Sequence, residues 1–195
     1  IRSWNELLDK AEATEGPKAL VTTGTGKFYS NGLDLEYMQS GEVEPAAYVE
    51  TVLAIMRRVL TFPAITIAAM NGHAFGAGAQ IALAHDYRIM RRDRGYFCMP
   101  EIDLGMPLHP GMTALIQARL PIQTAHEVIA TGTRYSGEMA LDSRIVDRVE
   151  DEANIVSSAV ELAAGLAAKA APVMSRLKAE MYPQVVEAMA SRMTG

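Results

Sequence analysis

The sequence predicts an α/β protein of layered strands and helices with a helical C-terminal part. Short runs of apolar and β-branched residues, typical of buried strands, alternate with longer segments whose apolar residues recur at helical spacing. From Ile155 onwards the helical pattern continues alone and is rich in alanine. No internal repeat or low-complexity linker interrupts the 195 residues, a length that fits one domain with a sizeable core.

The stretch 64–86 organises the predicted fold, because it combines a strand, two turns and a helix in succession. Residues 65–69 are small or β-branched and predict a buried strand, which Asn71-Gly72 ends. Gly76-Ala77-Gly78 forms a second turn before a helix expected at 79–84. Free backbone N–H groups and the helix dipole favour negative charge at such a helix N-terminus. If the chain performs chemistry, we expect an anion or a developing oxyanion here.

The segments before this stretch are, in order, a helix at 3–14, a strand at 18–23, a loop at 28–34 and a helix at 45–60. Ser3, with Glu6 three residues later, is the expected N-cap of the first helix. Gly16-Pro17 ends that helix, and Phe62-Pro63 ends the helix that leads into the central strand.

The segments after it are, in order, strands at 87–90 and 95–99, a loop at 105–110, helices at 112–120, 124–130 and 136–141, a strand at 145–149, and helices at 155–170 and 172–193. Pro121 separates the first two of these helices, and Ser136 is the expected N-cap of the third.

Composition narrows the function classes. The net charge of −5 comes without a basic run, which argues against a nucleic-acid partner. No charge-free apolar run is long enough to cross a bilayer, and we expect neither a signal peptide nor a membrane partner. A single cysteine, Cys98, excludes an intramolecular disulfide framework and fits a reducing compartment. We expect Cys98 to be buried and inert.

Three short motifs are candidates for chemistry, and each also has a structural interpretation. Ser30-Asn31-Gly32-Leu33-Asp34 is, by itself, a turn with an Asp cap. Gly76-Ala77-Gly78 lets a helix and a strand approach closely. Pro100-Glu101-Ile102 places a carboxylate among apolar residues, although a lone glutamate near a strand end is usually solvated or ion-paired. Each motif is a weak signal alone, and their order and spacing carry the functional hypothesis.

Four segments in this order resemble the crotonase (enoyl-CoA hydratase/isomerase) family. They are FYSNGLDL at 28–35, NGHAFGAGAQIALAHDYRI at 71–89, PEIDLG at 100–105 and SGEMALDSRIVDRV at 136–149. The resemblance implies the crotonase (ClpP/crotonase-like) fold, an α/β fold of stacked β-β-α units with a C-terminal helical region. It divides the chain into a core at 1–135, without the first strands of the family, and a helical region at 136–195 that closes the CoA site and forms oligomers.

The resemblance also implies a substrate and a way of binding it. The family binds acyl-CoA thioesters and holds the thioester oxygen between two backbone N–H groups, which fall here on Leu33 and Ala77. Two such donors stabilise the enolate formed when a proton leaves the carbon beside the thioester. Because CoA arrives as part of the substrate, no metal and no other cofactor are expected. The neighbouring residues expected to contact the substrate or its CoA part are Ser30, Asn31, Gly32, Asp34, Gly76 and Gly78.

Two positions decide which reaction the resemblance implies. Hydratases use two carboxylates, and the first falls on Gln80, whose amide cannot act as a general base. The second is present as Glu101, in apolar surroundings that we expect to raise its pKa. A single acid/base group resembles the 3,2-trans-enoyl-CoA isomerases, which convert 3-enoyl-CoA to 2-trans-enoyl-CoA in the β-oxidation of unsaturated fatty acids. The alternatives are an enoyl-CoA hydratase or another crotonase-type enzyme, and a non-catalytic acyl-CoA-binding protein.

Other residues keep two interpretations. His109 would assist or replace Glu101, or be an exposed loop histidine, which is the interpretation we favour. His73 would line the CoA channel or have a structural role. Lys178 would contact a CoA phosphate or, as we favour, be a solvated helix lysine, and His85-Asp86 is expected to cap a strand start rather than form a catalytic pair.

The remaining expectations concern the acyl pocket, the assembly and the compartment. The resemblance implies a homotrimer or a dimer of trimers. The expected location is the cytoplasm in a bacterium, and the peroxisome or mitochondrion in a eukaryote. The methionines expected to form the acyl pocket are Met70, Met99, Met106 and Met112.

Overall fold

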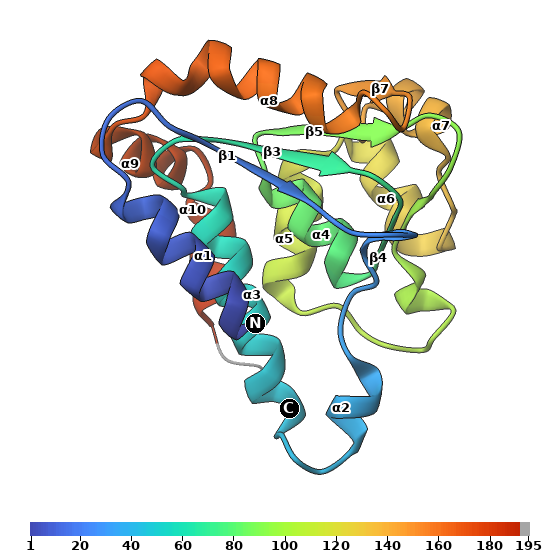
Figure 1. Ribbon diagram of the computed structural model, residues 1–195. Helices are drawn as coiled ribbons and strands as arrows, with labels where there is room; N and C mark the ends of the chain where they lie inside the picture. Colours follow the sequence, from blue (N-terminus) through green and yellow to red (C-terminus); the bar gives the residue numbers. More distant parts are fainter. Residues whose placement is uncertain (192–195) are drawn as a thin grey trace.

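The computed structural model describes residues 1–191 and contains two parallel sheets among helices (Figure 1). The larger sheet has the strand order β1-β3-β5-β7, and the smaller sheet has the order β2-β4-β6. The strands are β1 Ala19–Thr23, β2 Phe28–Ser30, β3 Ile65–Met70, β4 His73–Phe75, β5 Tyr87–Arg91, β6 Phe97–Cys98 and β7 Arg148–Glu150. The helices are α1 Arg2–Ala13, α2 Leu35–Gln39, α3 Pro45–Leu60, α4 Ala77–Ala84, α5 Pro110–Arg119, α6 Ile122–Thr131, α7 Gly137–Asp142, α8 Ile155–Leu166, α9 Pro172–Met181 and α10 Pro183–Ala190, with the 3₁₀ helices η1 Pro100–Ile102 and η2 Ala167–Lys169.

The larger sheet lies between α8 on one face and the helices α3, α4, α5 and α10 on the other (Figure 1). Side chains alternate along β3, as the pleat of a strand requires. Ile67 and Ala69 pack with Ala159 of α8, whereas Ala68 and Met70 belong to the larger hydrophobic cluster beneath the sheet. Because both faces are covered, β3 reads as an almost continuous apolar run.

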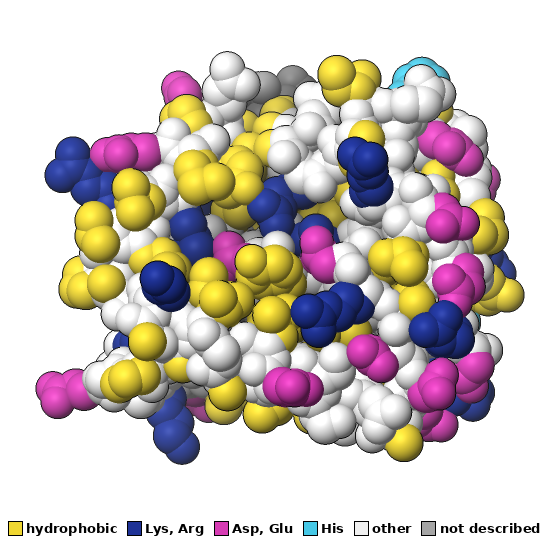
Figure 2. All heavy atoms as spheres, turned by 90° about the horizontal axis from the view of Figure 1, so that it is seen from above, with side chains coloured by type: hydrophobic (Ala, Val, Ile, Leu, Met, Phe, Trp, Pro, Cys, Tyr) yellow, Lys and Arg dark blue, Asp and Glu magenta, His cyan; other side chains and the backbone are white. Residues whose placement is uncertain are grey.

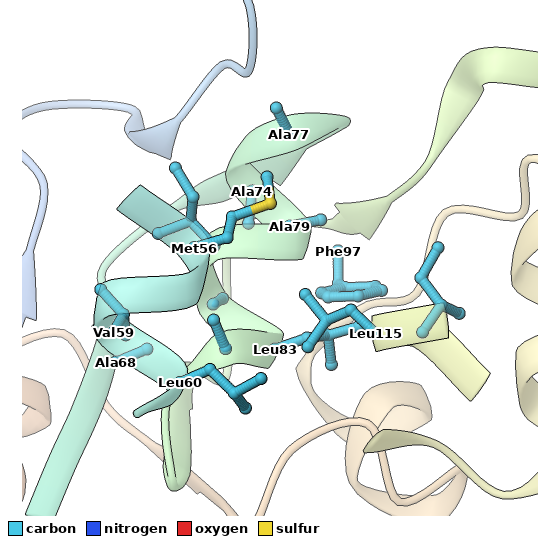
Figure 3. Close-up of a cluster of buried hydrophobic side chains, with 14 of the residues drawn as sticks. Met56, Val59, Leu60, Ala68, Ala74, Ala77, Ala79, Leu83, Phe97 and Leu115 are labelled. Carbon is cyan, nitrogen blue, oxygen red and sulfur yellow. The ribbon is translucent and has the colours of Figure 1, made fainter. Parts of the chain in front are cut away.

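Helix α4 occupies the centre of the larger cluster, and all its residues are buried. Small residues predominate in its sequence, AGAQIALA, so neighbouring elements can approach from every side. Figure 3 shows Met56 and Val59 of α3 on one flank of Ala79 and Leu83, and Leu115 of α5 on another. The helix whose N-terminus we expected to matter is therefore held rigidly by packing.

The face crossed by α8 carries apolar side chains interspersed with charged ones (Figure 2). Exposed apolar side chains on α8 and α9 are Val156, Val160, Val173, Leu177 and Met181. Within residues 1–191, no single helix is long and apolar enough to span a membrane. The consecutive segments Ile155–Lys169 and Pro172–Met181 reach that length and composition only as a pair, with a bend of 104°.

The predicted α/β fold class is confirmed, but two short strands differ from the prediction. The interpretation of 28–34 as a loop is wrong for its first three residues, which form β2. Strand β4 lies between the two glycine-containing turns, where we expected no strand. Each of these strands has three residues, too few to show an alternating pattern, and each pairs in parallel with a segment distant in sequence.

The helix boundaries also bring corrections. The single helix predicted at 172–193 is wrong, because Pro183 has no N–H to continue α9 and instead begins α10. The predicted end of that helix lies outside the described residues. Ser3 is not the N-cap of α1, which begins at Arg2. The domain boundary at residue 135 stays a prediction; α10 packs against α5 and α3 of the expected core.

Candidate active site

The N-terminus of α4 lies directly after β4, where Gly76 turns the chain into the helix. Gly76 has φ 50° and ψ −124°, a conformation that residues with a Cβ rarely adopt. The first N–H groups of a helix have no intrahelical acceptor. Within residues 1–191, the Ala77 N–H donates no hydrogen bond. The structure thus places a free N–H at the expected helix N-terminus.

The loop after β2 lies against this helix N-terminus. A Cβ added to Gly32, whose φ is +89°, would lie 2.7 Å from the Phe75 carbonyl oxygen and 3.3 Å from the Ala77 nitrogen. A Cβ on Gly78 would lie 2.6 Å from the Ser30 Oγ. Side chains at these two glycines would force the segments apart. Leu33, directly after Gly32, has a backbone N–H that also lacks an acceptor within residues 1–191.

Glu101 lies on η1, beside the start of α4. A Cβ on Gly76 would be 3.4 Å from Glu101 Oε1. The Gln80 amide donates a hydrogen bond of 3.0 Å from Nε2 to the same carboxylate oxygen. The second oxygen, Glu101 Oε2, is buried and has no partner among the described residues, and neither has Gln80 Oε1. Burial raises the pKa of Glu101, while the hydrogen bond from Gln80 opposes the rise.

A cavity of about 210 Å³ joins these groups. Glu101 is the one acidic side chain among its lining residues, and most of the wall is apolar. The lining residues are Asn31, Gly32, Leu33, Leu35, Met38, Pro45, Val49, Phe75, Gly76, Ala77, Gln80, Pro100, Glu101, Leu104, Met106, Pro107, Leu108, His109 and Met112. The cavity thus combines two free backbone donors and one carboxylate in apolar surroundings, an arrangement able to bind a carbonyl oxygen and move a proton next to it.

Three comparisons with known proteins agree on the family. A family model described as enoyl-CoA hydratase/isomerase matches residues 2–194. Enoyl-CoA delta isomerase 2, peroxisomal, from Arabidopsis thaliana is 36% identical over 90% of this chain and 78% of its own. The chain belongs to the enoyl-CoA hydratase/isomerase family.

Two further relatives show how wide this family is. The crystal structure of human mitochondrial delta3-delta2-enoyl-CoA isomerase has a TM-score of 0.84 and 25% identity, over 95% of this chain and 74% of its own. Carnitinyl-CoA dehydratase from Salmonella paratyphi A is 35% identical over 84% of this chain and 62% of its own. The crotonase fold inferred from the four sequence segments is therefore confirmed, while relatives of different activity share it.

His109 corrects an expectation about this member of the enoyl-CoA hydratase/isomerase family. It is 2% exposed, not an exposed loop residue, and it caps the N-terminus of α5 by accepting a hydrogen bond of 3.0 Å from the Gly111 N–H. His109 is one of the residues that line the cavity. Of the four methionines expected in the acyl pocket, Met106 and Met112 line the cavity, whereas Met70 and Met99 are buried elsewhere in the core.

Four residues expected at the substrate do not line the cavity of this family member. Ser30 and Gly78 instead form the close contact between β2 and α4. Asp34 caps α2 by accepting a hydrogen bond of 2.9 Å from the Tyr37 N–H. His73 packs among the rings of Phe28, Phe75 and Tyr96 on the smaller sheet.

Lys178 and the pair His85-Asp86 lie in the interior. Lys178 is neither solvated nor available for a CoA phosphate: it is 6% exposed and donates hydrogen bonds of 2.6 Å to Asp86 Oδ2 and 2.8 Å to the Ala64 carbonyl. Asp86 accepts from Thr66, which confirms its capping role at a strand start. Cys98 is buried, as expected. Within residues 1–191 no group of three or more potential ligands is placed to hold a metal ion.

Apart from Met106, the sequence did not reveal the apolar wall that α2, α3 and the loop after η1 contribute to the cavity. Val49 was recognisable only as one of several apolar residues on a helix face, a pattern that equally fits the core. Leu104 and Leu108 lie in a loop, where no periodicity indicates that they line a cavity.

Proposed function

We propose that the protein is an isomerase that converts 3-enoyl-CoA to 2-trans-enoyl-CoA. The observation that carries the proposal is the single carboxylate of the cavity, Glu101, beside two free backbone N–H groups. The thioester oxygen of the substrate accepts hydrogen bonds from the N–H groups of Leu33 and Ala77. Loss of one such donor typically lowers the rate by roughly 10²–10³.

Glu101 carries the proton in two steps. Its carboxylate takes a proton from C2, and the electron pair of the C–H bond spreads over a dienolate whose oxygen is held by the two N–H groups. The protonated Glu101 then returns the proton to C4, so that the double bond moves from C3–C4 to C2–C3. Because Gln80 holds Oε1, the unpartnered Oε2 is the oxygen available for proton transfer. The raised pKa of Glu101 brings it closer to that of the carbon acid it deprotonates.

Gln80 favours isomerisation over hydration. Hydration needs one group to activate water and another to protonate carbon, and the Gln80 amide has no proton-accepting ability near neutral pH. Its donation to Glu101 is a positioning role. The family's hydratases and dehydratases make hydration the second candidate, and an acyl-CoA-binding protein without activity is the third.

The variant Glu101→Gln tests the proposal with two substrates, 3-hexenoyl-CoA and crotonyl-CoA. We expect wild-type protein to isomerise the first and to hydrate the second poorly. In Glu101→Gln, kcat should fall by roughly 10²–10⁴, whereas binding of hexanoyl-CoA stays close to normal. The matched control is Glu161→Gln, at an exposed position of α8. Hydration of crotonyl-CoA without isomerisation of 3-hexenoyl-CoA would reverse the assignment.

Pathway, assembly and location follow as parts of this proposal. The product fits the β-oxidation of unsaturated fatty acids, in the cytoplasm of a bacterium or in the peroxisome or mitochondrion of a eukaryote. No cofactor beyond the CoA of the substrate is proposed. A homotrimer or dimer of trimers would bury exposed apolar residues of α8 and α9, and light scattering on the purified protein measures it.

A further inference from the structure

His109 has a fixed protonation pattern when it is neutral. Its Nδ1 accepts a hydrogen bond of 3.0 Å from the Gly111 N–H, so Nδ1 carries a lone pair and not a hydrogen. The hydrogen of the neutral imidazole is therefore on Nε2. With the lone pair of Nδ1 occupied, neutral His109 has no free basic nitrogen, and its Nε2–H is far too weak an acid to protonate carbon. His109 thus acts as a hydrogen-bond donor and does not replace Glu101.

The Nε2–H of His109 is buried and has no acceptor among the described residues. His109 lines the cavity together with Leu108 and Met112. The Leu108 side chain has no acceptor, and the Met112 thioether sulfur is only a weak one. A buried donor without an acceptor is unfavourable, so native proteins rarely keep one without a ligand or water to pair it. Five buried side-chain nitrogen or oxygen atoms in residues 1–191, donors and acceptors together, have no hydrogen-bond partner. Three of them belong to side chains that line this cavity: Gln80 Oε1, Glu101 Oε2 and His109 Nε2.

The proton shuttle uses only one of these three atoms, Glu101 Oε2. A purely hydrocarbon chain that fills the cavity offers no acceptor to the His109 Nε2–H and leaves this donor unpaired. An oxygen substituent on the chain accepts the hydrogen bond instead. A site built to hydrogen-bond a substrate oxygen discriminates strongly against an analogue that lacks it.

We infer that His109 is a specificity-determining residue, which selects acyl-CoA substrates whose acyl chain carries a hydroxyl or carbonyl oxygen. This inference rests on the proposed function, because it places the acyl chain in the cavity beside Glu101. A hydroxyl group both accepts and donates, so it is also able to use an unpaired acceptor such as Gln80 Oε1. A carbonyl group only accepts.

The test measures the binding of saturated acyl-CoA compounds, which cannot be isomerised. Hexanoyl-CoA is compared by calorimetry with hexanoyl-CoA carrying a hydroxyl or an oxo group at C4, C5 or C6. We expect at least one oxygenated compound to bind wild-type protein about tenfold more tightly than hexanoyl-CoA. A hydroxyl preference without an oxo preference would assign the second contact to an acceptor of the cavity. Equal or weaker binding of every oxygenated compound would overturn the inference.

The variant His109→Asn separates recognition from helix capping. Asparagine is a favoured N-cap and places an oxygen where Nδ1 lies, but it does not reach the position of Nε2. In this variant the oxygenated compounds and hexanoyl-CoA should bind about equally, so the tenfold preference is lost, while the affinity for hexanoyl-CoA changes little. Affinities that fall equally for all compounds would show a structural role and contradict the inference. The control is His126→Asn, at an exposed position of α6, which should keep the wild-type preference.

The two proposals fail separately. Oxygen-selective binding without turnover of any 3-enoyl-CoA, plain or oxygenated, would reject the isomerase and keep the role of His109. Isomerisation of plain 3-hexenoyl-CoA, together with unselective binding in the calorimetric series, would support the isomerase and reject the role of His109.

Discussion

Two groups of polar side chains lie inside this protein, and they differ in how completely they are paired. The first, here termed the interior network, links strands β1, β2, β3 and β5 with the end of α4 and with α9. It consists of Thr22, Tyr29, Thr66, His85, Asp86, Arg88 and Lys178. The second is the polar group of the cavity, Gln80, Glu101 and His109. Each of those three side chains leaves one buried atom without a partner, whereas no member of the interior network does, within residues 1–191.

The difference indicates which group serves folding and which serves a ligand. In the interior network, the Tyr29 hydroxyl donates to Thr22, the Thr22 hydroxyl donates to His85 Nε2, and His85 Nδ1 donates to the Ile81 carbonyl. This chain is complete without a ligand. The cavity group is incomplete, so its atoms are available to substrate.

The largest stability effect should come from breaking the interior network. Lys178→Met leaves the Asp86 carboxylate without its cation, and the free energy of unfolding should fall by about 3 kcal/mol. Urea denaturation measures the loss. Arg176→Met, on the same helix, removes an exposed ion pair with Glu180 and should change stability by less than about 0.5 kcal/mol. Similar losses in the two variants would show that the buried pair has no special role.

Acid should weaken the interior network through His85. Burial lowers the pKa of His85 to about 4, so the folded protein resists a proton that the unfolded chain binds below about pH 6.5. Stability should fall by up to about 3 kcal/mol as the pH drops from about 6.5 to 4.

Replacing the histidine removes this pH dependence. His85→Gln should be less stable overall because it loses hydrogen bonds, but the slope of stability against pH in this window should be smaller than in wild-type protein. Denaturation at several pH values gives the slope. The exposed His126→Asn should keep it, and an unchanged slope in His85→Gln would assign the acid sensitivity to other groups.

A subtler change in the cavity group should appear in the pH profile of activity. The Gln80 hydrogen bond lowers the pKa of Glu101 against the larger effect of burial. In Gln80→Leu, the acid limb of kcat/KM should therefore move to higher pH, since Glu101 must be ionised to take a proton. The matched control is Gln123→Leu at an exposed position. A limb that stays in place would mean that the hydrogen bond does not influence the ionisation that limits activity.

The smallest expected effect is a gain in stability on removing the charge of Glu101. The folded pKa of Glu101 is raised, so its contribution to stability is complete below the ordinary glutamate pKa and is lost as the pH rises through the folded value. Glu101→Gln does not ionise and should raise the Tm at pH 7 by about 2 °C. The difference should shrink as the pH falls below about 4. Calorimetry that finds a lower Tm at neutral pH would contradict this.

The same contrast explains how much was predictable from the sequence. The helix of α4, the strand β3 and Glu101 in apolar surroundings follow from local patterns, and the structure confirms them. The interior network does not follow from such patterns. Lys178 stands on an amphipathic helix where a solvated lysine is normal, and its partner Ala64 is 114 positions away.

The expectation that His109 is exposed was wrong for the same reason, because its burial depends on contacts between segments distant in sequence. The loop before α5 carries no pattern that indicates burial. A Cβ on Gly111 would lie 2.8 Å from the Met189 Cα, so the start of α5 packs directly against α10. That contact between distant segments places His109 inside, and one sequence alone does not contain it.

The close approach at Gly32 and Gly78 has a consequence for how this enzyme tolerates mutation. Gly32 and Gly78 have a hydrogen where every other residue has a Cβ, and this allows the backbone around the Leu33 and Ala77 amides to pack closely. In saturation mutagenesis, Gly32 and Gly78 should therefore be among the positions where substitution lowers activity most, although neither has a reactive side chain. Even alanine at either one would move both amides apart and blunt turnover while the hydrophobic interior stays intact.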